Sequence, residues 1–385
     1  MGRKLAEEGS VRFEIPDPEE YRTASGDYAP SLSEVFYNPR MEFCRDISVS
    51  VAQTLADELG ELKICDPLGG VGIRGIRYAK EVRGAVDVLI NDRSPAAHEL
   101  ASKNIQLNSP DIPVSAENED ANIVMLRNRG RFNFIDIDPF GSPARFVEAA
   151  CASISRKGMI ALTATDTGPL CGSYPRACLR RYGARPLRTE YCHELGIRIL
   201  IGFCQRVAGK HDLALEPVLV HSTLHYFRVY LRAIRRSSLA DKTVAGQGYI
   251  SHCFRCGGRR VQPEALSGER CACGGSLHHS GPLWTGELWN REFLQKTISD
   301  ISSRSFRQRA VEVELLSICL EESGGPPTFH DVNRIASMAG SSPPKMRRIM
   351  DSLRNSGRFA SRTHFSPTGI RTDAEMDDLL ALFRG

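Results

Sequence analysis

The chain has 385 residues, of which 41% are hydrophobic and 25% are charged, as in an ordinary globular protein. At roughly 150 residues per domain, this length predicts two or three domains. The sequence has no run of about 18 apolar residues, which excludes a transmembrane helix, and its first residues lack the apolar core of a secretory signal. Most of the 12 cysteines are dispersed, so we expect a cytoplasmic protein that contacts no membrane.

Basic residues are unevenly distributed, although the net charge is only +4. Arginine supplies 41 of the 50 basic residues, a bias that high genomic GC content would also produce. Residues 176–188 contain five arginines and no acid, and residues 334–371 contain eight basic side chains and one acid. Since arginine binds phosphate well, these stretches indicate a polyanionic partner. An ordinary solvated surface is the alternative.

The first 240 residues alternate between strand and helix patterns. We predict strands at 61–66, 85–90, 113–116, 132–137 and 158–165, with helices at 73–82 and 95–107. This alternation predicts an α/β fold with a doubly wound parallel sheet. The β-rich residues 217–233 would add antiparallel edge strands, and the polar residues 234–247 are expected to form a linker.

The remainder of the chain predicts an α+β domain. Residues 251–279 form a small cysteine-rich module. We then predict a helix at 306–322, helices at 329–338 and 343–355, and a hairpin at 358–372. The first of these helices is expected to bury an apolar stripe of Val311, Leu315, Ile318 and Leu320. The pattern is typical of a winged helix, with a plain helical bundle as the alternative, and we place domains at 1–240 and 241–385.

A glycine-rich turn follows the strand at 61–66. Gly70, Gly72 and Gly75 form the pattern G-x-G-x-x-G, which lets backbone N–H groups approach a nucleotide cofactor closely. Asp92 ends the next strand, where its carboxylate is able to accept hydrogen bonds from both ribose hydroxyls. These residues suit NAD and S-adenosylmethionine almost equally well, and a plain tight turn is a third interpretation.

Asp66 distinguishes between NAD and S-adenosylmethionine as the cofactor. It lies at the end of the strand, four residues before Gly70. A carboxylate there would repel the pyrophosphate of a dinucleotide, which sits over the helix N-terminus. S-Adenosylmethionine has no phosphate and carries a sulfonium and an ammonium group. We therefore favour a methyltransferase, with Arg45 or Arg74 as the partner that compensates the charge of Asp66.

The segment Asp138-Pro139-Phe140 follows the strand at 132–137 and resembles the Asp/Asn-Pro-Pro-aromatic motif of amino-methyltransferases. An exocyclic amine on a nucleobase is a poor nucleophile because its lone pair is delocalised into the ring. The Asp138 carboxylate and the Pro139 carbonyl are able to accept its two hydrogens and localise that lone pair, while Phe140 stacks on the base. The alternative is a helix-capping aspartate followed by proline.

Six stretches together resemble one known family, the tRNA (guanine-26 N2)-dimethyltransferases, and most closely its archaeal branch. They are residues 35–41, 72–77, 138–143, 164–166, 175–180 and 363–369. The resemblance spans nearly the whole chain. It implies a class I, Rossmann-like methyltransferase domain with an N-terminal extension, followed by a tRNA-binding C-terminal domain, and two successive methyl transfers to the N2 amine of guanine 26.

The resemblance also implies roles for individual residues. Arg45 and Arg74 would contact the methionine end of the cofactor, and Asp92 would hold the ribose. The adenine would be read by Asp120 and Ala121, although Glu117 and Glu119 are competing acids on the same segment. Asp138 would be the key catalytic residue, with Phe36 and Phe140 flanking a guanine that has left its stack. The two basic stretches would hold the tRNA backbone.

Four cysteines predict a structural zinc ribbon. Cys253-x2-Cys256 and Cys271-x-Cys273 have the spacing of two metal knuckles, although the second is one residue short, so His278 or His279 could replace one thiolate. Reduced, unliganded thiols are the alternative. Other cysteines, including Cys178 and Cys192, are interpreted as small core residues.

Two other functions stay open at this point. One is an NAD-dependent dehydrogenase, which Asp66 and the Asp138 motif disfavour. The other is a zinc-ribbon RNA-binding protein with an inert methyltransferase fold, which intact Asp92 and Asp138 disfavour. The sequence implies no protein partner, and it does not decide between a mono- and a dimethylated product.

Overall fold

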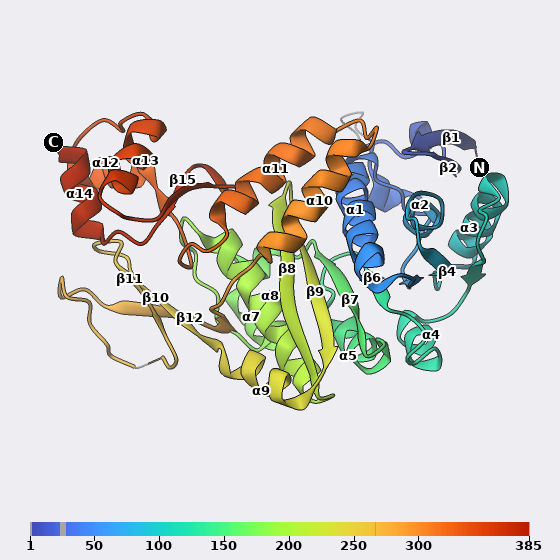
Figure 1. The fold of residues 1–385 in the computed structure, drawn as a ribbon, viewed down its shortest axis with the longest axis horizontal. Coiled ribbons are helices and arrows are strands. Elements are labelled where there is room, and N and C mark those ends of the chain that lie inside the picture. Colours follow the sequence, from blue (N-terminus) through green and yellow to red (C-terminus); the bar gives the residue numbers. More distant parts are fainter. Residues whose placement is uncertain (1, 24–27, 266, 385) are drawn as a thin grey trace. The chain divides into compact units, whose positions relative to one another are not determined.

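A seven-stranded sheet organises the chain, with strands in the order β5-β4-β3-β6-β7-β9-β8 (Figure 1). The computed structural model describes residues 2–23, 28–265 and 267–384. The strands are β3 (Leu62–Asp66), β4 (Ala85–Asn91), β5 (Val114–Glu117), β6 (Phe134–Ile137), β7 (Lys157–Ala164), β8 (Leu213–Thr223) and β9 (Tyr226–Arg235). The first five pair in parallel, which confirms the α/β class and the predicted parallel sheet.

The structure corrects the predictions for residues 217–247. β8 lies at the sheet edge, but β9 lies between β7 and β8 and is therefore not an edge strand. The predicted linker at 234–247 is wrong, because it contains helix α9 (Ser237–Ala245) and the first residue of β10 (Gln247–Cys253). Only Ala240 and Thr243 of α9 are buried, so this helix has almost no apolar stripe by which to recognise it.

The chain divides into two compact units. The first comprises the residues up to Thr163 with 230–235 and 292–314, and the second comprises 164–229, 236–291 and the chain from Leu315. The predicted domains of 1–240 and 241–385 stay a prediction. Helices of the first unit are α1 (Glu42–Leu59), α2 (Ile73–Glu81), α3 (Pro95–Asn108), α4 (Ala121–Arg127) and α5 (Ala144–Ser153), and α10 spans Arg291–Ser303. Among the described residues, no helix combines the length and the apolar character that a membrane span needs.

Besides helices α4 and α5, two larger elements of the first unit escaped prediction. One is the antiparallel hairpin of β1 (Arg3–Glu8) and β2 (Val11–Pro16). The other is α1, whose buried face includes Ser48, Gln53 and Thr54. Ser48 and Thr54 donate their hydroxyl hydrogens to carbonyls one turn earlier, at 2.7 and 2.9 Å, so burial costs them little. Because 15 of the 18 residues of α1 are buried, polar side chains interrupt its apolar ones and no exposed polar face sets off an apolar stripe.

The remaining helices and strands belong mainly to the second unit. The helices are α6 (Thr167–Leu170), α7 (Pro175–Tyr182), α8 (Cys192–Gly209), α11 (Arg309–Glu322), α12 (Val332–Ala339), α13 (Met346–Asn355) and α14 (Met376–Arg384). The strands are β11 (Arg259–Gln262), β12 (Leu277–Trp284), β13 (His330–Asp331), β14 (Ala360–Thr363) and β15 (Ser366–Thr372). They form two antiparallel sheets, in the orders β11-β10-β12 and β13-β15-β14.

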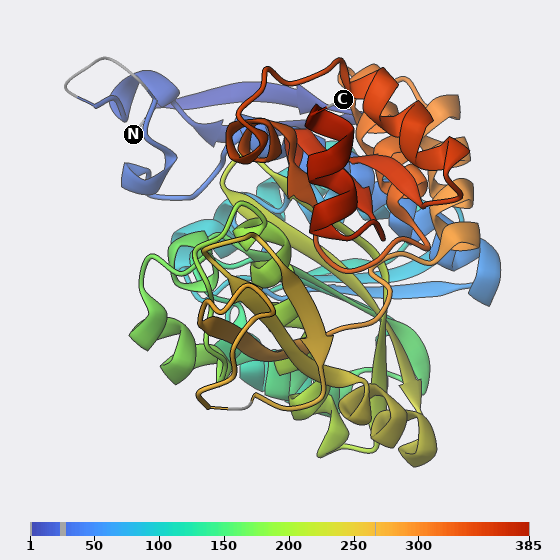
Figure 2. The same ribbon diagram turned by 90° about the vertical axis from the view of Figure 1, so that its left-hand side faces the viewer.

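The C-terminal elements share a small core of their own. Buried side chains of α12, α13, β15 and α14 pack together, among them Ile335, Ile349, Ile370 and Leu379. Figure 2 shows these helices, in red, gathered around their strands. The predicted hairpin at 358–372 is confirmed by the pairing of β14 with β15. The predicted stripe of α11 is wrong, because Val311 is 59% exposed and Leu315, Ile318 and Leu320 are only half-buried. The buried positions of this helix are Glu312, Leu316, Cys319 and Glu322.

Candidate functional site

The glycine-rich turn lies between β3 and α2, with Gly70 and Gly72 at φ +55° and +84°. Few residues other than glycine adopt these angles. A Cβ atom on Gly70 would lie 3.0 Å from the carbonyl oxygen of Phe36, and one on Gly72 would lie 3.0 Å from Cβ of Ala101. The turn therefore needs glycine both for its backbone angles and for its close packing.

Asp92, immediately after β4, holds this turn. Its Oδ2 accepts a hydrogen bond from the N–H of Gly70 at 3.1 Å, and its Oδ1 accepts one from the N–H of Ser94 at 2.9 Å. The carboxylate is thus fixed at the carboxyl end of the parallel strands, where open α/β sheets bind ligands. The structure brings Asp92 and the glycine turn together as the sequence predicted.

Asp66 lies beneath the same turn and is 1% exposed. Its Oδ2 accepts a hydrogen bond from the N–H of Gly75 at 3.1 Å, whereas its buried Oδ1 has no hydrogen-bond partner among the residues that the structure describes. Burial raises the pKa of Asp66 to about 7; Arg74 opposes this shift, while Asp136 and Asp138 add to it. Asp66 is therefore a buried acid with one free acceptor, next to the turn.

Neither predicted partner donates to Asp66. Arg45 donates to both carboxylate oxygens of Glu8, at 2.7 and 2.5 Å, and to the carbonyl of Asn38 at 3.1 Å. Arg74 donates to Ser48 Oγ at 3.0 Å and forms ion pairs with Asp136 and Asp138. Arg74 is 4% exposed, so it reaches Asp138 from inside the protein.

Asp138 and Phe140 form the exposed side of the site. The Asp138 side chain is 21% exposed, and Phe140 is 67% exposed. The rings of Phe36 and Phe140 meet edge to face, with centroids 4.2 Å apart and planes at 76°. This contact leaves no space for a base between them, so the two rings flank a guanine only if Phe140 moves. Gly141, at φ +78°, is a backbone position where such a movement is possible.

The adenine-reading candidates lie after β5. Asp120 is exposed and caps α4 by accepting a hydrogen bond from the N–H of Asn122 at 2.8 Å, while Ala121 is buried. The competing acids are engaged: Glu117 pairs with Arg127, and Glu119 accepts from the N–H of Asp120 at 2.9 Å. This arrangement favours Asp120 among the three acids.

The site also contains residues that the sequence analysis missed. Glu8 binds Arg45 and accepts a hydrogen bond from the Tyr37 hydroxyl at 2.8 Å. No sequence signal marked Glu8, because the hairpin that carries it was not predicted. Asp136, fully buried in β6, pairs with Arg74. The sequence did contain a signal for Asp136, because an acid in the middle of a buried strand requires a partner.

The four cysteines of the predicted zinc ribbon converge. Their sulfur atoms all lie within 4.8 Å of one another, and the pairs Cys253–Cys273 and Cys256–Cys271 are 3.5 Å apart. Thiolates around a tetrahedral zinc lie about 3.8 Å apart, so the donor set fits that ion. The alternative histidines have other contacts: His279 Nδ1 lies 2.7 Å from Ser251 Oγ, and the ring of His278 packs against Phe254.

The comparisons with known proteins agree with this geometry. Residues 9–384 match the family model described as N2,N2-dimethylguanosine tRNA methyltransferase. The chain belongs to this family. A tRNA (guanine(26)-N(2))-dimethyltransferase of Methanosphaera stadtmanae is 41% identical, over 99% of this chain and 97% of the relative. The corresponding protein of Methanothermobacter thermautotrophicus is also 41% identical, with 97% of each chain covered.

A solved structure extends the agreement to three dimensions. Trm1 from Pyrococcus horikoshii, in complex with S-adenosyl-L-methionine, superposes with a TM-score of 0.87 at 34% identity, and covers 98% of this chain and 99% of that one. The family resemblance inferred from the six sequence stretches is therefore confirmed. Membership disfavours the dehydrogenase, whose cofactor would place a pyrophosphate beside Asp66.

Proposed function

We propose that the chain transfers methyl groups from S-adenosylmethionine to the N2 amine of guanine 26 in tRNA. The observation that carries the proposal is the placement of Asp138-Pro139-Phe140 beside the glycine-rich turn, at the carboxyl ends of β3, β4 and β6 in a chain of this family. When bound, S-adenosylmethionine supplies a methyl group attached to a positively charged sulfur. The chain itself has to bind the cofactor and the guanine, orient them, and accept the hydrogens of the amine.

The residues present fit that cofactor. The unpaired buried Oδ1 of Asp66 is an acceptor for a cationic group, such as the ammonium of the methionine end. Asp92 offers two carboxylate oxygens to a ribose, next to the N–H groups of the turn. Arg45 already pairs with Glu8, and Arg74 already pairs with Asp138. We propose that each arginine also contacts the methionine carboxylate of the cofactor while it keeps its protein partner.

The raised pKa of Asp66 predicts a pH dependence of cofactor binding. Below pH 7 the carboxyl is protonated and does not attract the cationic cofactor; above pH 7 it is ionised and does. The Kd for S-adenosylmethionine should therefore fall roughly tenfold between pH 6 and pH 8. Titration calorimetry at the two pH values measures it. Asp66→Asn should remove most of the change, and a Kd in the wild-type chain that is independent of pH would contradict the assignment.

The methyl transfer itself is driven by positioning. The Asp138 carboxylate and the Pro139 carbonyl accept the two hydrogens of the guanine amine, which directs its lone pair at the methyl group. Asp138 must shift its ion pair from Arg74 toward the amine, and the buried Arg74 keeps the carboxylate oriented during this exchange. Phe140 stacks on the extruded base. After the transfer, the amine loses one proton to the Asp138 carboxylate, which passes it to solvent, and no covalent enzyme intermediate is required.

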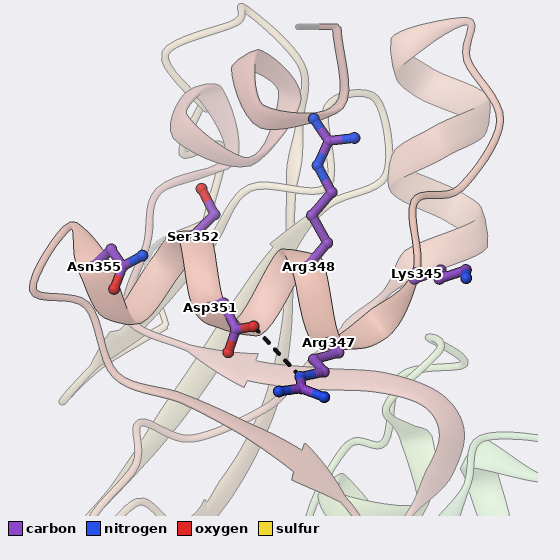
Figure 3. A pocket seen from close by; sticks show the side chains of 6 residues that line it. All are labelled: Lys345, Arg347, Arg348, Asp351, Ser352 and Asn355. Carbon is purple, nitrogen blue, oxygen red and sulfur yellow. Dashed lines mark ion pairs between the residues drawn. The ribbon is translucent and has the colours of Figure 1, made fainter.

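We propose that the C-terminal residues 241–385 bind the tRNA. The elements α11, β13, α12, α13, β14 and β15 follow one another as in a winged helix, which supports that assignment. Figure 3 shows a shallow depression on α13 lined by Lys345, Arg347, Arg348, Asp351, Ser352 and Asn355. Arg347 lies 3.7 Å from Asp351, a weak exposed pair that leaves the guanidinium available to phosphate. The cytoplasmic location remains a prediction.

The α13 surface leads to a second prediction. Arg347→Glu with Arg348→Glu should raise the KM for tRNA about tenfold or more, because two phosphate contacts are replaced by repulsion, while kcat at saturating tRNA stays close to that of the wild type. The matched control is Arg129→Glu with Arg156→Glu, which makes the same charge change at exposed positions outside the C-terminal domain. Equal effects of the two double variants on KM would contradict a specific role for α13.

The proposed zinc ribbon has a direct test. Cys271→Ser should lower the bound zinc from one ion per chain to almost none, because a hydroxyl is a poor substitute for a thiolate ligand. Cys204→Ser, at a buried position of α8 outside the cluster, should keep the ion. Elemental analysis of the purified chains measures both. Absence of zinc in a wild-type chain prepared with zinc would support the reduced, unliganded thiols instead.

The methyltransferase proposal is tested by incubating the chain with labelled S-adenosylmethionine and unmodified tRNA transcripts. A transcript with guanine at position 26 should accept the label, and a transcript with adenine there should not. RNA binding without any transfer of label would favour the second candidate function, an RNA-binding protein with an inert methyltransferase fold.

A further inference from the structure

A second group of thiols lies outside the four-cysteine cluster. The sulfur atoms of Cys171 and Cys192 and a ring nitrogen of His193 all lie within 4.8 Å of one another. Both thiols are free; Cys171 is 8% exposed and Cys192 is half-buried. Cys171 directly follows α6, and Cys192 is the first residue of α8. Cys192 was predicted to be a core residue, but it lies half-buried at the start of a helix.

The segment between the two cysteines forms a loop whose two ends are in contact. A Cβ atom on Gly172 would lie 3.0 Å from the backbone nitrogen of Arg188, so the two ends of the segment are in contact. A disulfide requires Cα atoms about 4.4–6.8 Å apart and sulfur atoms about 2 Å apart. Because the two sulfur atoms lie within 4.8 Å of each other, a bond between them requires an approach of about 3 Å at most.

Cys192 is the more reactive of the two thiols. A hydrogen bond from Cys171 lowers the pKa of Cys192; burial opposes this shift, and backbone N–H groups at the start of α8 together with Arg188 support it. The same interaction raises the pKa of Cys171. A lowered pKa increases the fraction of thiolate, which is the species that attacks a disulfide.

We propose that Cys171 and Cys192 form a reversible disulfide by exchange with a small-molecule disulfide such as glutathione disulfide. The Cys192 thiolate attacks one sulfur of that molecule, its S–S bond breaks, and one small thiolate leaves. Cys171 then loses its proton to solvent and attacks the Cys192 sulfur, which releases the second small thiolate. Two protein thiols are oxidised, and one disulfide is reduced to two thiols.

The cross-link would close the segment that carries the basic stretch 176–188. Its five arginines are Arg176, Arg180, Arg181, Arg185 and Arg188, and all are exposed. Closing a loop reduces the number of open conformations that its residues visit. Under the proposed function these arginines meet tRNA, so the thiol state would set the flexibility of a substrate-binding segment. That consequence rests on the proposed function, whereas the cross-link does not.

Mass spectrometry tests the cross-link. The reduced, zinc-supplemented chain is incubated with glutathione disulfide, alkylated, and digested without reductant. The wild-type chain should yield linked Cys171 and Cys192 peptides before any other disulfide. In Cys171→Ser, Cys192 should carry glutathione instead, and Cys204→Ser should form the same link as the wild type. Absence of the link, or a second zinc ion that the reduced wild-type chain binds and Cys192→Ser loses, would overturn the proposal.

Limited trypsin digestion provides an independent measurement. In the oxidised wild-type chain, cleavage after Arg176, Arg180 and Arg181 should slow about threefold or more relative to the reduced chain. In Cys192→Ser, the same treatment should leave the rate unchanged. Equal rates in the oxidised and reduced wild-type chains would overturn the claimed restraint. Neither measurement uses tRNA, so failure of methyl transfer and failure of this proposal are separate outcomes.

Discussion

Replacing Asp138 with asparagine is expected to lower kcat for methyl transfer by about 10²–10⁴-fold. Asparagine has nearly the shape of aspartate but offers one acceptor oxygen in place of two, and its NH2 group would face the donors of Arg74 and the guanine amine. The Kd for S-adenosylmethionine should change little, because Asp66 and Asp92 remain. Single-turnover methylation of tRNA, combined with calorimetry of cofactor binding, measures the two effects separately.

The matched control for this variant is Asp87→Asn. Asp87 lies on β4 and makes a surface ion pair with Arg131 at 2.9 Å, so the substitution removes the same charge from the same sheet. Its rate should stay near that of the wild type. If Asp138→Asn keeps a tenth or more of the wild-type kcat, lone-pair localisation by this carboxylate is wrong.

Arg371→Met should cause the largest loss of stability. Arg371 is 1% exposed, and it donates to Glu194 at 2.8 and 3.2 Å and to Glu322 at 2.7 and 3.0 Å. Removing one partner of a buried ion pair leaves charges without compensation, which costs about 3–5 kcal/mol. The free energy of unfolding from denaturant titration, followed through the fluorescence of Trp289 near Arg371, should fall by that amount.

Arg362→Met is the control for this prediction. Arg362 lies on β14, the strand paired with β15, and its ion pair with Glu321 is half-exposed at 45% and 38%. Such pairs contribute less than about 1 kcal/mol. Losses of equal size in the two variants would show that the buried network is not what stabilises the second unit.

The same network gives a pH dependence of stability. Burial acts to raise the pKa of Glu194, but Arg371 and Arg198 outweigh it and hold the pKa at about 2. The unfolded chain has the ordinary value near 4.5. The contribution of Glu194 is therefore complete above pH 4.5 and is lost as the pH falls toward 2. The Arg371→Met chain should lose less stability over this range than the wild type does.

The parallel sheet was predictable because short, mainly apolar segments alternate with helical patterns in the first half of the chain. Residues 61–66 and 132–137 each end at an aspartate or an Asp-Pro step, and each was placed within two residues of the observed strand. The proximity of Asp66, Asp92 and Asp138 was also predictable. Each residue lies at the carboxyl end of a strand, and parallel strands have their carboxyl ends at the same edge of the sheet.

Elements with polar buried faces were not predictable. Helix α1 is buried on almost every side, so Ser48, Gln53 and Thr54 are buried beside the apolar residues that recur every four positions from Phe43 to Leu55. Helix α9 buries too little to show a stripe, and α11 buries Glu312 while exposing Val311. In each case the contacts that decide the buried face come from distant parts of the chain, which residue order alone does not reveal.

The partners of charged groups were equally hidden. Both arginines of the site were assigned to the cofactor, and the structure pairs Arg45 with Glu8 and Arg74 with Asp136 and Asp138. Glu8 lies 37 residues from Arg45 in the sequence, and spacing alone gives no means of choosing it. A sequence shows which charged residues a site contains and roughly where they lie. The partner of each charged residue depends on the fold.

The most direct test of the central claim is nucleoside analysis of a tRNA transcript methylated by the wild-type chain. Digestion to nucleosides and mass spectrometry identify the product, and a transcript with adenine at position 26 reports the site. N2-methylated guanosine should accumulate, should be absent from the adenine transcript, and should be nearly absent with Asp138→Asn. Methylation at another guanine atom, or equal methylation of the adenine transcript, would contradict the account.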